Sequence, residues 1–313
     1  MTALVLAGAV LVFVVAYFTY GRFMERRVVG TSGEAPPSHR FRDGIDYVPT
    51  NRFVLFGHHF ASIAGVGPIV GPTIALVWGW LPGLLWVWVG SIFLGGVHDY
   101  FSLASSVRYD GKSIQYVAQR LLGRITGRSF AWFILFLCIL VVAAFASVAA
   151  TTFVETPGAG ASFLLMTVAA LVLGFLLYRT KIPFGISTLI GIVMLAGCVF
   201  AGTVLQAVFP FHVWIVLFFV YIVIASAIPV NLLLQPRDYL NSFLLYFGLL
   251  VGGIAALAGF RGFDIPAVSV WAPKLLGFGK GLVDTPFWPT IILVVACGSI
   301  SGFHSLVASG TSS

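Results

Sequence analysis

Two adjacent histidines and an aspartate lie in a part of this sequence where titratable residues are unusual. His58 and His59 fall within residues 53–98, a stretch without Asp, Glu, Lys or Arg, and Asp99 follows directly after His98. A buried histidine and carboxylate can share a proton near neutral pH, and each lowers the cost of burying the other. On two antiparallel membrane helices both groups would lie at the same depth. We therefore predict that His58, His59 and Asp99 form a proton-linked polar cluster. Alternatively, Asp99 anchors the end of its helix in water.

Glycines and prolines surround the histidine pair. Residues 56–72 contain four glycines and two prolines. Proline removes a backbone hydrogen bond, so such a segment within a membrane must pack against protein or line a wet cavity. Broken helices of this kind form the substrate sites of many secondary transporters. The pattern predicts an unwound binding segment, whereas close helix packing through small residues is the alternative. Its candidate contacts are Ser62, Gly65, Gly67, Pro68 and Gly71.

The last stretch of the sequence, residues 297–313, is rich in Ser, Thr and Gly. A helix of this composition should face protein or water, and its spacing Gly302-x-His304-x5-Gly310 repeats that of Gly57-x-His59-x5-Gly65. Inverted repeats would place two such segments antiparallel. The candidate solute contacts here are His304, Ser305, Ser309 and Thr311.

A third interrupted stretch, residues 228–239, ends in adjacent opposite charges. Arg237 and Asp238 are either a clamp that attracts a solute carboxylate from the cytoplasmic side or an interfacial ion pair.

The elements that position these residues are membrane helices. Of the 313 residues, 59% are hydrophobic and 9% are charged, against about 25% charged in a soluble domain. This composition excludes a soluble enzyme, a disordered chain and a disulfide-rich secreted module. Cys138, Cys198 and Cys297 lie far apart in apolar runs, as small apolar fillers do. No metal or cofactor site is predicted.

Uncharged runs long enough to cross a bilayer predict an all-α integral membrane protein with about nine spans, some broken. We expect one membrane domain over residues 1–313. The expected spans lie in residues 2–21, 53–98 (two), 129–154, 156–178, 182–236 (two), 239–260 and 285–313.

Basic residues define the expected orientation. Fourteen of the 17 would lie on one side, mostly in the loops of residues 21–52 and 108–128, against three near the external loop of residues 261–287. The positive-inside rule then places the N-terminus outside. Residues 114–122 have the apolar spacing of an interfacial amphipathic helix. The basic residues form no stripe for nucleic acid, and the sequence has no GxxxxGK[ST] motif for ATP.

Four motifs in order resemble the carbon starvation protein family, CstA. They are residues 57–65 with Gly67-Pro68 and Gly71-Pro72, His98-Asp99, residues 234–240, and residues 301–305 followed by 308–311. The resemblance implies a bacterial inner-membrane secondary transporter, induced by carbon starvation, that imports peptides or, in some relatives, pyruvate. It also implies the inverted-repeat core of the amino acid, polyamine and organocation transporters. Members of that family are longer, so we expect this sequence to be part of a longer product.

These observations together predict uptake of a small carboxylate-bearing solute, coupled to protons or to sodium. The backbone of residues 65–71 and the hydroxyl groups of residues 305, 309 and 311 would contact the solute. A membrane-embedded nutrient sensor and a His/Asp metalloenzyme are the alternatives. The oligomeric state and the choice between peptide and pyruvate are left open.

Overall fold

The computed structural model describes residues 2–30, 33, 35–259, 262, 264–269, 274–277, 281–284 and 286–313. Most of these residues are helical, and the two strands among them form one antiparallel hairpin, β1 (Lys274–Gly277) and β2 (Gly281–Asp284). The predicted all-α class is therefore confirmed.

Contacts divide the chain into two compact units. The first unit contains Met1–Pro36, Ile63–Ile114 and Phe247–Ser313, and the second contains Pro37–Ser62 and Gln115–Tyr246. The single membrane domain expected from the sequence stays a prediction, and each unit is described by itself.

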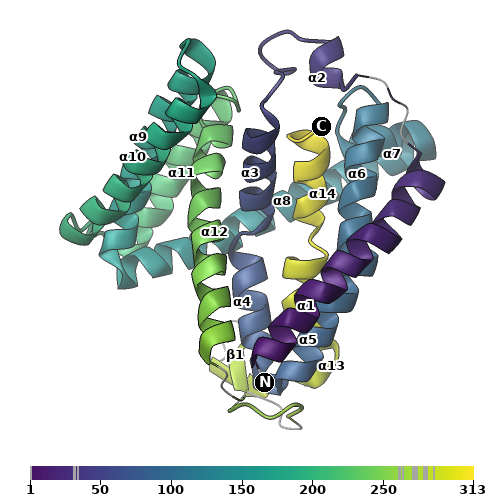
Figure 1. The fold of residues 1–313 in the computed structure, drawn as a ribbon, viewed down its shortest axis with the longest axis vertical. Helices are drawn as coiled ribbons and strands as arrows, with labels where there is room; N and C mark the ends of the chain where they lie inside the picture. The colour runs from purple at the N-terminus through teal and green to yellow at the C-terminus, as the bar shows by residue number, and fades with distance from the viewer. Residues whose placement is uncertain are drawn as a thin grey trace. The chain divides into compact units, whose positions relative to one another are not determined.

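Long apolar helices build the first unit. Helix α1 and the π-helical stretches η1 and η2 form one continuous element, as do α5, η4 and α6 (Figure 1). The elements of this unit are α1 (Thr2–Ala16), η1 (Tyr17–Gly21), η2 (Met24–Val29), α4 (Val66–Ala75), η3 (Leu76–Trp78), α5 (Trp80–Val89), η4 (Gly90–Gly95), α6 (Gly96–Arg108), α13 (Phe287–Ser299) and α14 (Gly302–Gly310). The buried side chains of Ala75, Trp78, Ile291 and Val295 pack together where α4 and η3 meet α13.

The described residues of the second unit form seven helices and the first half of an eighth. Helices α9 and α10 lie side by side (Figure 1). Trp214 on α11 is fully buried and its ring contacts Phe153 of α8 and Phe218. The elements are α2 (Pro37–Arg40), α3 (Arg52–Ile63), α7 (Ile114–Leu122), α8 (Arg124–Glu155), α9 (Pro157–Arg179), α10 (Phe184–Val204), α11 (Phe211–Ala227) and α12 (Leu234–Gly259), whose second half belongs to the first unit.

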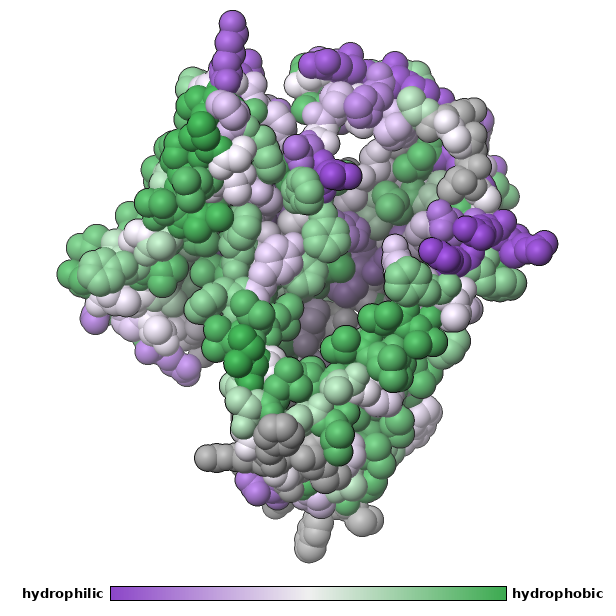
Figure 2. Space-filling view, in the orientation of Figure 1, coloured by the Kyte–Doolittle hydropathy of each residue, from purple (hydrophilic) through white to green (hydrophobic). Residues whose placement is uncertain are grey.

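Six helices in the described part of the chain are long and apolar enough to cross a membrane. They are Thr2–Val29, Trp80–Arg108, Arg124–Glu155, Pro157–Arg179, Phe184–Val204 and Leu234–Gly259. The bent pair Arg52–Ile63 and Gly67–Trp78 makes a seventh if it is one span, and Phe211–Ala227 and Phe287–Ala296 are shorter. Each expected span thus has a helical counterpart, but nine spans stay a prediction. Figure 2 shows hydrophobic residues over much of the visible surface, as a lipid-facing protein requires.

Of the expectations about the loops, one is corrected and one is confirmed. The loop expected at residues 21–52 begins only at Gly30, where φ is 64°, because no proline interrupts the helix before it and Gly21 alone does not end it. Within residues 108–128, the predicted amphipathic helix is confirmed as α7, with Val117 buried and Leu121 and Leu122 exposed. Most of the external loop expected at residues 261–287 lies outside the described residues.

Candidate functional site

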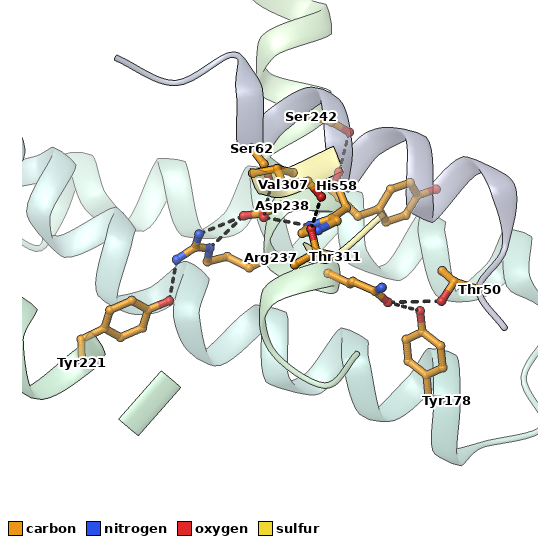
Figure 3. A network of polar contacts seen from close by, with 12 residues as sticks. Thr50, His58, Ser62, Tyr178, Tyr221, Arg237, Asp238, Ser242, Val307 and Thr311 are labelled. Carbon is orange, nitrogen blue, oxygen red and sulfur yellow. Dashed lines mark hydrogen bonds and ion pairs between the residues drawn. The ribbon is translucent and has the colours of Figure 1, made fainter. Parts of the chain in front are cut away.

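A buried carboxylate joins a histidine and an arginine in the second unit. Asp238 lies in the second turn of α12, and its Oδ2 is 2.9 Å from Nδ1 of His58 on α3. Ser62, one turn further along α3, donates its hydroxyl to the same oxygen at 2.9 Å. The side chains of His58 and Asp238 are only 4% and 9% exposed. Figure 3 shows the three side chains converging. The structure therefore pairs His58 with a carboxylate 180 residues away.

The second oxygen of this carboxylate binds Arg237. The guanidinium of Arg237 donates to Asp238 Oδ1 from Nη2 at 2.9 Å and from Nε at 3.1 Å. Its Nη1 donates to the hydroxyl of Tyr221 on α11 at 2.6 Å (Figure 3). The sequence left open whether Arg237 and Asp238 are a clamp for a solute carboxylate or an interfacial ion pair. In the structure the two side chains form an ion pair with each other.

Arg237 also lines a cavity of about 810 Å³ in the second unit. The other walls come from the end of α8, where Glu155 adds an acidic group, the start of α9, the end of α10 with the residues that follow it, and the next turns of α12. Ser162, Gln206 and Asn241 are among these lining residues. The Arg237 side chain is 26% exposed, whereas that of Asp238 is 9% exposed. The arginine is therefore the member of the pair that a solute in this cavity would meet.

Local sequence explains how α12 presents these charges. Pro236 lies in the first turn of α12, where a missing backbone N–H costs nothing. Gly57 lets α3 approach closely, since a Cβ on it would lie 2.8 Å from Cδ2 of Tyr239 and 2.9 Å from Oγ of Ser242. This approach brings His58 within hydrogen-bonding distance of Asp238.

Further hydrogen bonds hold the start of α12. Oε1 of the buried Gln235 accepts from the hydroxyl of Tyr178 at 2.9 Å and from Oγ1 of Thr50 at 3.4 Å. The hydroxyls of Tyr239 and Thr188 lie 3.2 Å apart. These contacts connect α12 to α9, to α10 and to the segment before α3. They therefore fix the position of the helical turn that carries Arg237 and Asp238.

A second polar cluster lies in the first unit and centres on Asp99 of α6. Its Oδ1 is 3.1 Å from Nδ1 of His98, and its Oδ2 is 3.5 Å from Nδ1 of His304 on α14. His304 is buried. Beside this cluster, Ser106 donates its hydroxyl to the carbonyl of Ser309 at 2.9 Å. Within the first unit, His98 and His304 thus lie beside Asp99. The histidines that the sequence analysis proposed for this position are His58 and His59.

Within its own unit, each member of the predicted grouping of His58, His59 and Asp99 that forms a described ion pair does so with a residue outside the grouping. Asp238 is the carboxylate that the second unit provides for His58, and within the first unit His98 and His304 are the histidines at Asp99. Matching depth on two helices could not identify partners, because it leaves the facing directions of the side chains open. A cluster of all three residues stays a prediction. His59 lies half-buried on α3.

The glycine- and proline-rich segment is less unwound than predicted. Only Ala64 and Gly65 leave the helix, and α4 resumes at Val66. Pro68 is tolerated because it lies in the first turn of α4, where its missing N–H has no partner to lose. The unwound segment expected within residues 56–72 is therefore reduced to a two-residue break, and solute contact by the backbone of residues 65–71 stays a prediction.

Close packing explains two of the proposed contacts in this segment. A Cβ on Gly71 would collide with the carbonyl of Val294 on α13, and a Cβ on Gly298 would lie 2.8 Å from Cα of Pro68. The alternative interpretation, close packing through small residues, therefore accounts for Gly71 and Pro68.

The hydroxyl groups of α14 that were expected to contact solute donate to their own helix. Ser305, Ser309 and Thr311 donate to backbone carbonyls three or four residues earlier, at 2.9, 2.8 and 3.0 Å respectively. A hydroxyl oxygen that donates a hydrogen bond can also accept one. Their role at a solute site stays a prediction.

Sequence reasoning missed Tyr221, Tyr178 and Gln235. A tyrosine in an apolar run carries no signal by itself, because aromatic residues are common in membrane helices. Gln235 could have been found, since it is an uncharged polar residue next to Pro236 in an otherwise apolar stretch.

Within the described residues, no three His, Cys, Asp or Glu side chains gather as ligands of one metal ion would. Cys138 and Cys198 are free and lie in apolar helices. The structure thus provides no described site from which to develop the metalloenzyme alternative.

The whole chain, residues 1–313, matches the family model described as carbon starvation protein CstA. The chain belongs to the CstA family. Members include a protein named peptide transporter CstA from Bacillus subtilis (strain 168), which is 35% identical over 98% of this chain and 52% of its own length. The pyruvate/proton symporter BtsT from Escherichia coli (strain K12) is 32% identical over 98% of this chain and 44% of its own length.

A protein named peptide transporter CstA from the same Escherichia coli strain is 32% identical over 98% of this chain and 45% of its own length. The chain therefore spans about half the length of these curated relatives. No solved structure gives a significant match.

Proposed function

We propose that this chain is part of a secondary transporter of the bacterial inner membrane that imports a peptide or a small carboxylate such as pyruvate together with a proton. Family membership and the names of the relatives support transport. The apolar helices support a membrane location. The orientation with the N-terminus outside rests on the distribution of basic residues.

The observation that carries the proposal is the shared carboxylate of Asp238. One of its oxygens binds the guanidinium that lines the cavity, and the other contacts a buried histidine. A guanidinium binds a carboxylate with two parallel hydrogen bonds, so a solute carboxylate would compete with Asp238 for Arg237. A cavity of about 810 Å³ has the size of a small-molecule site.

Coupling to a proton follows from this competition. When a proton reaches His58, the imidazolium becomes a second cation at the carboxylate of Asp238 and competes with Arg237 for it, so Arg237 is held less strongly and is available to the solute. When the proton leaves, Asp238 regains Arg237 and displaces the solute. Proton binding and solute binding are then linked by one free energy, as a symporter requires.

The Asp99 cluster is the second place where we propose that a proton is held. Its carboxylate faces His98 and His304, and an imidazole side chain can both accept and release a proton. Residues 305, 309 and 311 lie on the same short helix as His304 or directly after it, so solute contact at this cluster is part of the proposal.

The test is uptake by cells that lack their own pyruvate and peptide systems and express this protein. Labelled pyruvate and a labelled dipeptide are supplied in parallel, with and without a protonophore. We expect uptake of one of them, and we expect the protonophore to abolish it.

Two arginine variants test the site itself. Arg237→Gln should abolish uptake while the protein remains in the membrane, because glutamine is uncharged and cannot form the two-bond contact with a carboxylate. Arg179→Gln is the matched control, since Arg179 is exposed at the end of α9 and lies outside the lining of the cavity. Normal uptake by Arg237→Gln would overturn the site. Absence of uptake of either solute would overturn the function and favour a nutrient sensor.

A further inference from the structure

A second cavity lies in the first unit, and none of its lining residues belongs to the candidate sites described above. Its volume is about 800 Å³, and it lies between the N-terminal helix and the helix formed by η4 and α6. Figure 1 shows the N-terminal helix crossing in front of α5 and α6 in this unit. No role in transport has been assigned to these residues.

The walls of this cavity are amphipathic. Phe13, Phe18, Ile92 and Val97 give it an apolar part. Phe13 and Phe18 are 39% and 53% exposed, so part of each ring is accessible to a ligand in the cavity. An apolar wall of this kind between membrane helices suits acyl chains.

Charges gather at one end of the cavity. Arg22 and Arg26 line it four residues apart on one continuous helix, and Glu25 lines it as well. Residues four apart lie on the same helix face, so the two guanidinium groups can reach one ligand. Among the described residues, neither arginine forms an ion pair, although Arg22 lies over the ring of Phe18. These three side chains carry a net charge of about +1 near neutral pH.

Unusual backbone occurs on both sides of the cavity. Residues from the π-helices η1 and η2 line one wall, and Ser91 and Ile92 of the π-helix η4 line the other. π-Helices make up well under 1% of residues in globular proteins and occur frequently at functional sites. Gly21 and Gly96 add space because they carry no side chain into the cavity. The π-helical walls are therefore a second observation, independent of charge, that points to a functional site at this cavity.

We propose that this cavity binds one anionic phospholipid. The phosphate lies between Arg22 and Arg26, and the acyl chains lie against the apolar wall. A headgroup with one net negative charge complements the charge of about +1 in the site, and headgroup hydroxyls can donate to Glu25. Phosphatidylglycerol has this chemistry. Phosphatidylethanolamine and phosphatidylcholine are neutral overall and leave the site charged.

The test measures lipid retention by the purified protein. The protein in mild detergent is incubated with phosphatidylglycerol, phosphatidylethanolamine or phosphatidylcholine of identical acyl chains, and bound lipid is counted by native mass spectrometry. We expect the wild type to retain phosphatidylglycerol preferentially. The double variant Arg22→Gln, Arg26→Gln should lower this retention roughly tenfold. Arg27→Gln, from the same exposed segment but outside the cavity lining, should retain it.

A filling variant tests the cavity without changing charge. A Cβ on Gly21 would meet its nearest atom at 3.7 Å, so Gly21→Leu is tolerated by the backbone and occupies the cavity. Gly8→Leu is the control on the same helix, where a Cβ has nothing within 4 Å. We expect only Gly21→Leu to lose the lipid. Equal retention of all three lipids by the wild type, or an unchanged preference in the arginine variant, would overturn the proposal whatever solute the protein carries.

Discussion

Replacing Asp238 by asparagine tests whether the buried charge network holds α3 and α12 together. Asparagine has almost the same shape as aspartate, so packing is preserved. Its amide oxygen can still accept from Arg237, while its NH₂ group faces His58 and Ser62, which can both accept. The substitution therefore removes the negative charge and little else.

The magnitude follows from the two bonds that Arg237 donates. Each changes from a bond between charged groups to a bond with a neutral amide, which lowers its contribution by about 1 kcal/mol. Solvent screens the pair only weakly, because the side chains of Arg237 and Asp238 are 26% and 9% exposed. We expect the free energy of unfolding of Asp238→Asn to fall by about 2 kcal/mol.

The assay is denaturant unfolding of the purified protein in detergent, followed by tryptophan fluorescence. Asp46→Asn is the control, since Asp46 is exposed in the same unit and its substitution should change the free energy by less than about 0.5 kcal/mol. A loss for Asp238→Asn no larger than that of the control would refute the reasoning. Proton-dependent uptake should be lost in the same variant.

Three further predictions concern other positions. Gly57→Ala should lower the free energy of unfolding by about 1–3 kcal/mol through overpacking, whereas Gly248→Ala, with open space around its Cβ, should be neutral or stabilising by up to about 1 kcal/mol. Equal unfolding curves for the two variants would contradict this. Trp214→Ala should cost about 3–5 kcal/mol because the indole is fully buried, and a loss below that of a surface substitution would show that the aromatic cluster is not a core. Backbone N–H groups of Tyr47 and Ile45 hold the pKa of Asp43 below its ordinary value, so the order they give to the loop is present above about pH 4 and is lost as pH falls through the lowered pKa. Limited proteolysis should therefore cut this loop in Asp43→Ala but not in the wild type at pH 7, and equal cutting would refute the role of the carboxylate.

The helices and their breaks were largely predictable from local signals. The amphipathic spacing of residues 114–122 predicted α7, and Gly65 was among the residues that predicted the break before α4. The width of that break was not predictable, because a proline ends a helix or begins one according to its position in the turn. Pro68 lies in the first turn of α4, and only the backbone conformation shows this.

The amino-acid sequence is enough to place the chain in a membrane, and four motifs in it indicate the family. Its long uncharged runs fit a lipid environment, since the cost of burying Asp, Glu, Lys or Arg in lipid far exceeds that of burying an apolar residue. Which polar side chains meet depends on how the helices pack. His58 and Asp238 lie 180 residues apart, and their contact depends on α3 crossing α12 closely at Gly57. Helical spacing gives the depth of a side chain but leaves its facing direction to packing, and for this reason the sequence singled out both His58 and Asp238 but not their contact.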